Sequence, residues 1–154
     1  MSIETGTPHQ SRDDITSHIV DAALQIHRDL GPGLLESVYE AILARELVTR
    51  GLLVERQKAI DFEYRGEKYQ EGFRIDLLVE HDVVVELKSV EHISMVHTKQ
   101  LLTYLKLLNA PVGLLINFGG ATLKEGLKRV VNSCSLSYSP RLTAMRSAPP
   151  TRAT

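Results

Sequence analysis

The spacing of hydrophobic residues predicts two helices in the first third of the chain. Residues 12–30 carry apolar side chains at helical spacing, namely Ile15, Ile19, Ala22, Ala23, Ile26 and Leu30. The start of this helix is indicated by three residues that could cap it, Ser11, Asp13 and Asp14. Gly31 and Pro32 end it. A second helix is predicted from residue 34 to residue 50, because Gly51 follows as a C-terminal stop.

After Gly51 the hydrophobic pattern changes from helical spacing to alternation. Residues 52–66 (LLVERQKAIDFEYRG) and 67–80 (EKYQEGFRIDLLVE) alternate in this way, which predicts two strands joined by a turn at Arg65-Gly66. A third strand, VVVELK at 83–88, follows after a link of three residues. These three strands are expected to pair as neighbours in one antiparallel sheet.

The remaining pattern predicts a helix, a strand and a last helix. Residues 91–109 are apolar at helical spacing, and residues 112–118 (VGLLINF) are typical of a strand buried on both faces. The last helix is expected over residues 122–131. A helix between strands 83–88 and 112–118 allows a right-handed crossover, so these two strands are expected to be parallel. The predicted fold is an α/β (α+β) domain with a mixed central sheet flanked by helices, ordered helix, helix, three strands, helix, strand, helix.

Composition places this pattern in a single domain between two polar ends. The chain has 154 residues, of which 43% are hydrophobic and 24% charged, as is usual for a globular domain. Residues 1–11 are expected to be a flexible lead, residues 12–133 the folded domain, and residues 134–154, rich in Ser, Pro, Thr and Arg, a disordered tail.

Charge and cysteine content limit the classes of function. A formal net charge of -1 excludes a strong general basic excess, so any nucleic-acid role must depend on a local cluster. The single cysteine, Cys134, excludes an intramolecular disulfide. The sequence has no apolar run long enough for a membrane span and no apolar signal core at its start. A cytoplasmic protein without membrane contact is therefore expected.

The stretch DVVVELKSV, residues 82–90, places charged side chains in a strand that begins as apolar. Glu86 and Lys88 project to the same face, because strand side chains alternate. If residues 80–82 form the hairpin link, Asp76 lies directly opposite Glu86 on the neighbouring strand. Two facing carboxylates destabilise a sheet, and burial adds a desolvation cost of several kcal/mol per ion. Lys88 supplies one compensating charge, and a divalent cation would supply two more.

Polar residues on two predicted helices are candidates for the same site. Glu36 shares a stripe of the second helix with Tyr39, Leu43 and Leu47, although it could equally serve only to favour the helix N-terminus. On the third helix, His97, Gln100 and Tyr104 share one face, where such residues more often cap a core. The six histidines show no zinc-site spacing, and no glycine-rich phosphate loop is present.

These residues resemble the motifs of a known family. GLLESVY, residues 33–39, is similar to the GxxExxY signature of a family of small proteins within the PD-(D/E)XK nuclease superfamily. Asp76 followed by Glu86-Leu87-Lys88 resembles the D…ExK core, and Gln100 with Tyr104 resembles the QxxxY motif of the RecB-like branch. The likeness covers about residues 12–131. Ile75 stands before Asp76 where the superfamily name has proline, and this proline is often absent in the superfamily.

The resemblance implies a restriction-endonuclease-like core that carries a magnesium-dependent (or manganese-dependent) phosphodiesterase site. Asp76, Glu86 and Lys88 are then the catalytic residues, and the metal ligands are Glu36, Asp76, Glu86 and the Leu87 carbonyl. Substrate would be positioned by Gln100, Tyr104 and Tyr39, with Arg74 as a further neighbour. The expected partner is nucleic acid, DNA in the first instance and RNA as the alternative.

Two other interpretations stay open at the level of sequence. The chain could be a nuclease-fold module that binds nucleic acid or a partner protein without cleaving anything, since it is small and lacks a separate DNA-reading domain. Asp76, Glu86 and Lys88 could also be a buried ion network that serves the fold only, although such networks stabilise proteins poorly. The helical faces and Leu52-Leu53 leave a homodimer open.

Overall fold

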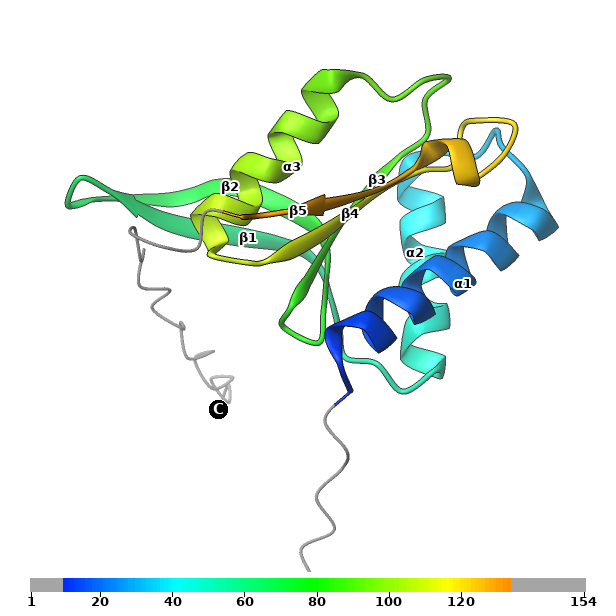
Figure 1. The fold of residues 1–154 in the computed structure, drawn as a ribbon, viewed down its shortest axis with the longest axis horizontal. Coiled ribbons are helices and arrows are strands. Elements are labelled where there is room, and N and C mark those ends of the chain that lie inside the picture. The colour runs from blue at the N-terminus through cyan, green and yellow to red at the C-terminus, as the bar shows by residue number, and fades with distance from the viewer. Residues whose placement is uncertain (1–9, 134–154) are drawn as a thin grey trace, which may run out of the picture.

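The computed structural model of the protein describes residues 10–133. The predicted tail, residues 134–154, and nearly all of the predicted lead lie outside the described residues. The described part forms five strands in one sheet, with helices on both faces. Two helices pack on one face and a third on the other, as Figure 1 shows. None of the helices in this described range is long and apolar enough to cross a bilayer.

The two N-terminal helices confirm the signals read from the sequence. Helix α1 spans Arg12–Leu30, and the side chains of Ser11 and Asp14 form a capping box at its start. The backbone leaves this helix at Gly31, where φ is 68°. Helix α2 spans Glu36–Thr49, so it begins two residues later than predicted. Both helices bury an apolar stripe against the sheet.

The predicted hairpins are confirmed, and the β2–β3 register agrees with the prediction from Val79–Val83 to Leu77–Val85, but Asp76 and Glu86 are not a ladder pair. Strands β1 (Val54–Tyr64) and β2 (Glu67–Val79) are antiparallel and turn at Arg65-Gly66. Strand β3 (Val83–Lys88) pairs with β2 in the expected register, with Leu77 opposite Val85 and Val79 opposite Val83. These pairings bring Asp76 and Glu86 to the same end of the β2–β3 ladder.

The crossover between the two central strands is also confirmed. Helix α3 spans Met95–Leu108 and leads into β4 (Val112–Asn117), which pairs in parallel with β3 over its whole length. Every residue of β4 is buried, as expected for a strand covered on both faces. Helix α3 therefore lies on the face opposite α1 and α2.

The helix predicted over residues 122–131 is wrong. A short 3-10 helix, η1 (Lys124–Gly126), is followed by strand β5 (Leu127–Val131), which pairs antiparallel with β4. A helix through Gly126 is unfavourable because glycine lowers helix stability. The free edge of β4 instead offers five backbone partners to a β-branched segment, from Val112–Val131 to Ile116–Leu127. The sheet order is thus β1-β2-β3-β4-β5.

Side chains of β3 alternate between the two layers. Val83, Val85 and Leu87 belong to the cluster that packs under α1 and α2. Val84 belongs to the second cluster, which contains Leu101 and Leu105 of α3. Glu86 and Lys88 continue the row of Val84, so they lie on the α3 side of the sheet.

Candidate active site

The backbone pairing of β2 with β3 ends before Asp76, where the side-chain carboxylates of Asp76 and Glu86 accept hydrogen bonds from backbone N–H groups. The Asp76 N–H donates to Glu86 Oε1 over 3.2 Å, and the Leu87 N–H donates to Asp76 Oδ2 over 2.8 Å. Ile75 packs in the α3 cluster, whereas Leu77 packs in the α1–α2 cluster. The strand therefore changes face at Asp76, whose carboxylate fills the gap between the strands.

The change of face has a counterpart on β1. Arg56 pairs with Leu77 and Lys58 pairs with Ile75, but Gln57 between them adopts a left-handed backbone with φ of 48°. Such a conformation is costly for a residue other than glycine and often marks a functional site. It lets the Gln57 amide donate to Asp76 Oδ1 over 3.1 Å.

Gln57 also connects Asp76 to a carboxylate of α2 that the sequence reasoning missed. Gln57 Nε2 donates to Glu40 Oε1, and Arg56 Nη2 donates to Glu40 Oε2 over 3.2 Å. Glu40 is only 4% exposed. A signal for it was present, because Glu40 follows Glu36 by one helical turn and so shares its side of α2.

The GxxExxY residues form the loop before α2 and the first turn of this helix. Gly33 has φ of 117°, a value that strongly favours glycine. The Tyr39 hydroxyl donates to the Gly31 carbonyl and accepts from the Leu34 N–H over 3.2 Å. The loop held in this way delivers Glu36 into the first turn of α2, where the Ser89 N–H donates to its carboxylate.

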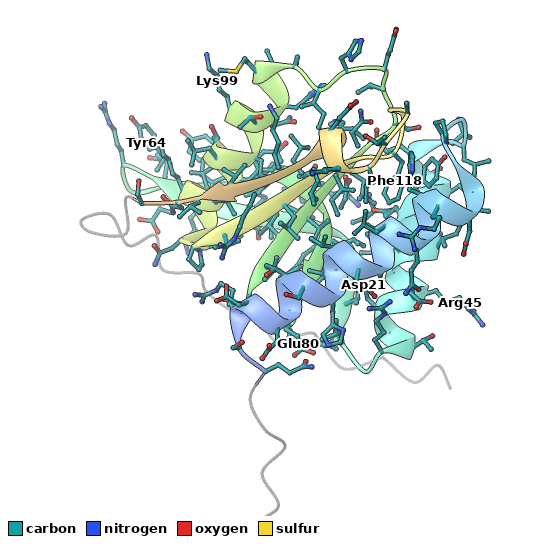
Figure 2. All side chains as sticks on the ribbon, turned by 45° about the vertical axis from the view of Figure 1, so that its right-hand side comes forward. Asp21, Arg45, Tyr64, Glu80, Lys99 and Phe118 are labelled. Carbon is teal, nitrogen blue, oxygen red and sulfur yellow. The ribbon has the colours of Figure 1, made fainter. Side chains whose placement is uncertain are left out.

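Tyr39 does not have the exposure that the predicted substrate-binding role requires. Its side chain is fully buried, and its ring stacks on Phe118 with centroids 4.4 Å apart. Phe118 lies at the end of β4, on the side of α1 and α2 (Figure 2). Tyr39 is therefore a core residue that shapes the loop before Glu36, because its hydroxyl is occupied by backbone groups.

Tyr104 and Gln100 approach the carboxylates from α3. Tyr104 is partly buried and hydrogen-bonded to Gln100, which is exposed. Burial raises the pKa of Tyr104, and the charges of Glu86 and Asp76 raise this pKa further. The two motif residues predicted to contact substrate thus lie beside the acidic pair. His97, on the same face of the helix, instead accepts from the Ser94 N–H and closes the capping box of α3.

Lys88 is a cation whose charge acts on three of the acidic groups. It is partly exposed, and its charge lowers the pKa of Glu36, Asp76 and Glu86. The chain beyond it is fixed by Asn117, whose side chain donates to the Val90 carbonyl and accepts from the Val90 N–H. Sequence reasoning missed Asn117, which is 2% exposed and holds the loop that contacts Glu36.

A pocket of about 440 Å³ opens on the α2 side of Asp76. Its lining residues are Leu35, Glu36, Ser37, Glu40, Gln57 and Asp76. Three carboxyl groups thus face one cavity, and Glu86 meets Asp76 from the side of α3. Arg74, the further neighbour considered above, is exposed and donates to the Gln57 carbonyl over 3.4 Å.

Burial is the largest cause of the raised pKa values of Glu86, Asp76 and Glu36. It raises the pKa of Glu86, and together with the adjacent Asp76 charge it moves this pKa from 4.5 to about 8. Burial likewise raises the pKa of Asp76 and of Glu36, although hydrogen bonds and Lys88 oppose the change. Glu86 therefore holds a proton at neutral pH when no cation is bound, and its carboxyl is hydrogen-bonded to Asp76.

The predicted cluster of three acidic metal ligands is not formed. Across residues 10–133, no three His, Cys, Asp or Glu side chains are close enough together to hold a metal ion. Asp76 and Glu86 are in contact, but Glu36 lies across the pocket with its carboxylate bound to Ser89. The donors present still fit a hard divalent cation, because magnesium is usually held by one or two carboxylates and several waters.

Comparison with known proteins gives the superfamily of the chain. The family model of the PD-(D/E)XK nuclease superfamily matches residues 13–130, which is most of the chain. The chain therefore belongs to the PD-(D/E)XK nuclease superfamily. The five-stranded mixed sheet with its helices is consistent with the restriction-endonuclease-like fold of that superfamily. Searches of curated proteins and of solved structures found no significant match.

Membership has consequences for the general chemistry. Nucleases of this superfamily generally depend on divalent metal ions, and membership implies nucleic acid as the substrate. It suggests a nuclease function for this chain.

Proposed function

We propose that this protein is a metal-dependent nuclease that hydrolyses phosphodiester bonds of DNA at the Asp76, Glu86 and Lys88 site. The observation that carries this proposal is the contact between two carboxyl groups beside one lysine, where the Asp76 N–H donates to Glu86 and the neighbouring Leu87 N–H donates to Asp76. Such a pair is unfavourable for the fold alone, since burial raises the pKa of both groups. The GxxExxY branch of the superfamily fits the chain, because Gly33, Glu36 and Tyr39 build one loop.

The residues of the chain suit distinct tasks in hydrolysis. A divalent cation such as Mg²⁺ or Mn²⁺, held by Asp76 and Glu86 with the Leu87 carbonyl as a further oxygen donor, would polarise the scissile phosphate and acidify a water. The Leu87 N–H and the Gln57 amide orient the Asp76 carboxylate. The Lys88 ammonium stabilises negative charge that develops on the phosphate. Tyr104 and Gln100 contact the nucleic-acid strand near the carboxylates.

One observation favours a second candidate, a nuclease-fold module that binds nucleic acid or a partner protein without cleaving it. Glu36 does not join Asp76 and Glu86 in a three-carboxylate cluster within the described range. If the module interpretation holds, a cation still binds but no substrate is cut. A cytoplasmic location and a homodimer both stay predictions.

Cleavage assays decide between these candidates. Fluorescent single-stranded DNA, duplex DNA and RNA would be incubated with the wild type in Mg²⁺, Mn²⁺ or EDTA. We expect cleavage of DNA that EDTA abolishes, and a loss of about 10²- to 10³-fold in Lys88→Ala, because the variant removes a transition-state charge partner. Lys106→Ala, at an exposed position in the last turn of α3, is the matched control and keeps full activity. Equal activity in Lys88→Ala would refute the proposed site, and no cleavage by the wild type would favour the second candidate.

A further inference from the structure

Most of the β1–β2 hairpin extends beyond the rest of the sheet. Strand β2 runs over Glu67–Val79, but β3 pairs only with Leu77, Leu78 and Val79. The residues before Asp76 therefore form a two-stranded arm, whose inner end packs under α3 through Ile60 and Ile75 and whose outer part projects from the body of the domain in Figure 1. Two-stranded hairpins are marginally stable alone, so side-chain contacts across the arm matter.

A row of aromatic rings, which we call the arm row, leads from the tip of this arm to the candidate active site. The row consists of four rings in contact, Tyr69, Phe62, Phe73 and Tyr104, and of Tyr64, which follows Phe62 by two residues on β1 and so shares its face. Phe62 stacks on Tyr69 with centroids 5.2 Å apart, and Phe62 lies 6.3 Å from Phe73. Phe73 in turn stacks on Tyr104 over 4.3 Å. The charges of Glu86 and Asp76 raise the pKa of Tyr104, which places this end of the row beside the acidic pair.

The outer rings of the arm row are open to solvent. Tyr64 is 49% exposed and Tyr69 is 46% exposed, and Figure 2 shows Tyr64 at the outer end of the arm. The Phe62–Tyr69 pair stabilises the hairpin, but that contact leaves about half of the Tyr69 side chain uncovered. The Arg65 guanidinium lies 5.2 Å from the centre of the Tyr64 ring, where it supplies a positive charge next to an exposed aromatic face.

The charge of the arm favours contact with bases over contact with phosphates. Residues 54–79 include five basic residues, Arg56, Lys58, Arg65, Lys68 and Arg74, and six acidic ones, Glu55, Asp61, Glu63, Glu67, Glu71 and Asp76. A surface that follows duplex DNA depends on an excess of Lys and Arg against the phosphates. Bases of a single strand, in contrast, stack on aromatic side chains whatever their sequence.

We propose that the arm row binds single-stranded nucleic acid by base stacking on Tyr64 and Tyr69 and directs that strand to Asp76 and Glu86. This inference rests on the proposed function, and it narrows the substrate to strands with unpaired bases. In a duplex the bases are stacked on each other and their faces are not available to a protein surface. The arm therefore selects single strands through the rings that it presents.

Binding measured in EDTA tests the arm row without any cleavage. Fluorescence anisotropy would report the affinity of the wild type for a labelled 12-nucleotide DNA strand of mixed sequence and for its duplex. The double variant Tyr64→Ala/Tyr69→Ala is expected to bind the strand at least about 10-fold more weakly, since each stacked base contributes strongly to affinity. The matched variant Tyr64→Phe/Tyr69→Phe keeps both rings and is expected to bind within about 2-fold of the wild type. Thermal unfolding would confirm that both variants fold.

The dependence on salt supplies a second measure. Stacking with few phosphate contacts predicts less than about a 10-fold loss of affinity between 50 and 200 mM salt, whereas six to ten phosphate contacts would lose about 10³- to 10⁵-fold. Unchanged single-strand binding by the alanine double variant, or preferential binding of duplex, would overturn the inference. The inference would also be overturned if the wild type is a dimer and the alanine double variant is a monomer that binds the single strand with unchanged affinity. The arm row would then be an interface between two copies of the chain.

Failure of the arm-row proposal and failure of the nuclease proposal give different results. Failure of cleavage in the wild type, with single-strand binding that needs the two rings, would reject the nuclease proposal and keep the arm row. Cleavage that depends on Lys88 but not on the two tyrosines would keep the nuclease proposal and reject the arm row.

Discussion

The backbone N–H of Asp76 donates to the carboxylate of Glu86 over 3.2 Å, at a position where a sheet ordinarily supplies a backbone carbonyl. Asp76 in turn accepts from the Leu87 N–H. The carboxylates thus replace the last hydrogen bonds of the β2–β3 ladder, so the groups of the site also end the pairing of these two strands. Substitutions at Asp76 should therefore separate its structural role from its chemical role.

Asp76→Ala and Asp76→Asn are expected to differ in stability but not in activity. Alanine leaves the Leu87 N–H without its acceptor, which costs about 1–3 kcal/mol. Asparagine keeps an oxygen for the Leu87 N–H, although it loses the one that accepts from Gln57, and it removes a charge from beside Glu86, so in EDTA it should be more stable than Asp76→Ala. Urea unfolding measures both variants, and both should be inactive. Strong destabilisation by Asp76→Asn would instead indicate a buried ion network that serves the fold.

The protonation of Glu86 predicts an unusual dependence of stability on pH. Its pKa rises from 4.5 to about 8 on folding, so between these values the folded state holds a proton that the unfolded state has released. The free energy of unfolding in EDTA should therefore fall as pH rises from about 4.5 to 8, by an amount on the order of a few kcal/mol. Below pH 4.5 both states are protonated and this contribution stays at its maximum.

Glu86→Gln provides the control for that measurement. The variant cannot ionise at this position, so most of the fall in stability between pH 5 and pH 8 should disappear. An equally steep fall in Glu86→Gln, measured by urea unfolding at several pH values, would show that other groups cause it.

Gln57 is expected to be a positioning residue for Asp76. Gln57→Gly removes the amide that joins Glu40 to Asp76, but it also relieves the left-handed backbone at φ of 48°. The relief offsets the lost contacts, so stability should stay within about 1 kcal/mol of the wild type. Cleavage should fall about 10- to 100-fold in kcat with KM little changed, because Asp76 loses its orientation. Full activity in a folded Gln57→Gly variant would exclude this role.

A substitution at Tyr39 tests whether the GxxExxY tyrosine acts by holding the loop before Glu36. Tyr39→Phe keeps the stack on Phe118 but removes the hydroxyl that bonds the Gly31 carbonyl and the Leu34 N–H. We expect a loss of about 1–3 kcal/mol in the free energy of unfolding, since buried polar groups lose their partner. Single-strand affinity in EDTA should be unchanged. A selective loss of affinity without destabilisation would restore the role in substrate binding.

Local signals made the first helices and the hairpin turns predictable. Ser11 with Asp14 forms a capping box within four residues, and Arg65-Gly66 forms a tight turn between neighbouring strands. Strand β5 was not predictable in this way, because its structure depends on the free edge of β4. A segment with mixed propensities takes the structure that its tertiary neighbours allow.

The site shows the same limit. The proximity of Asp76 and Glu86 was predictable because the strand register brings these two residues to the same end of the β2–β3 ladder. Gln57 carries no sequence signal, since its left-handed backbone arises from the change of face in the adjacent strand. The position of Glu36 relative to the acidic pair is a tertiary relationship, which spacing along a helix cannot show.

Anomalous scattering from crystals grown with Mn²⁺ would test most directly whether the acidic pair binds a divalent cation. We predict one strong peak within about 2.0–2.6 Å of carboxylate oxygens of both Asp76 and Glu86, a range typical of oxygen ligands to hard divalent cations. The peak should be absent from crystals of the Asp76→Asn variant. A wild-type crystal saturated with Mn²⁺ that shows no peak between these two carboxylates would contradict the proposed metal site.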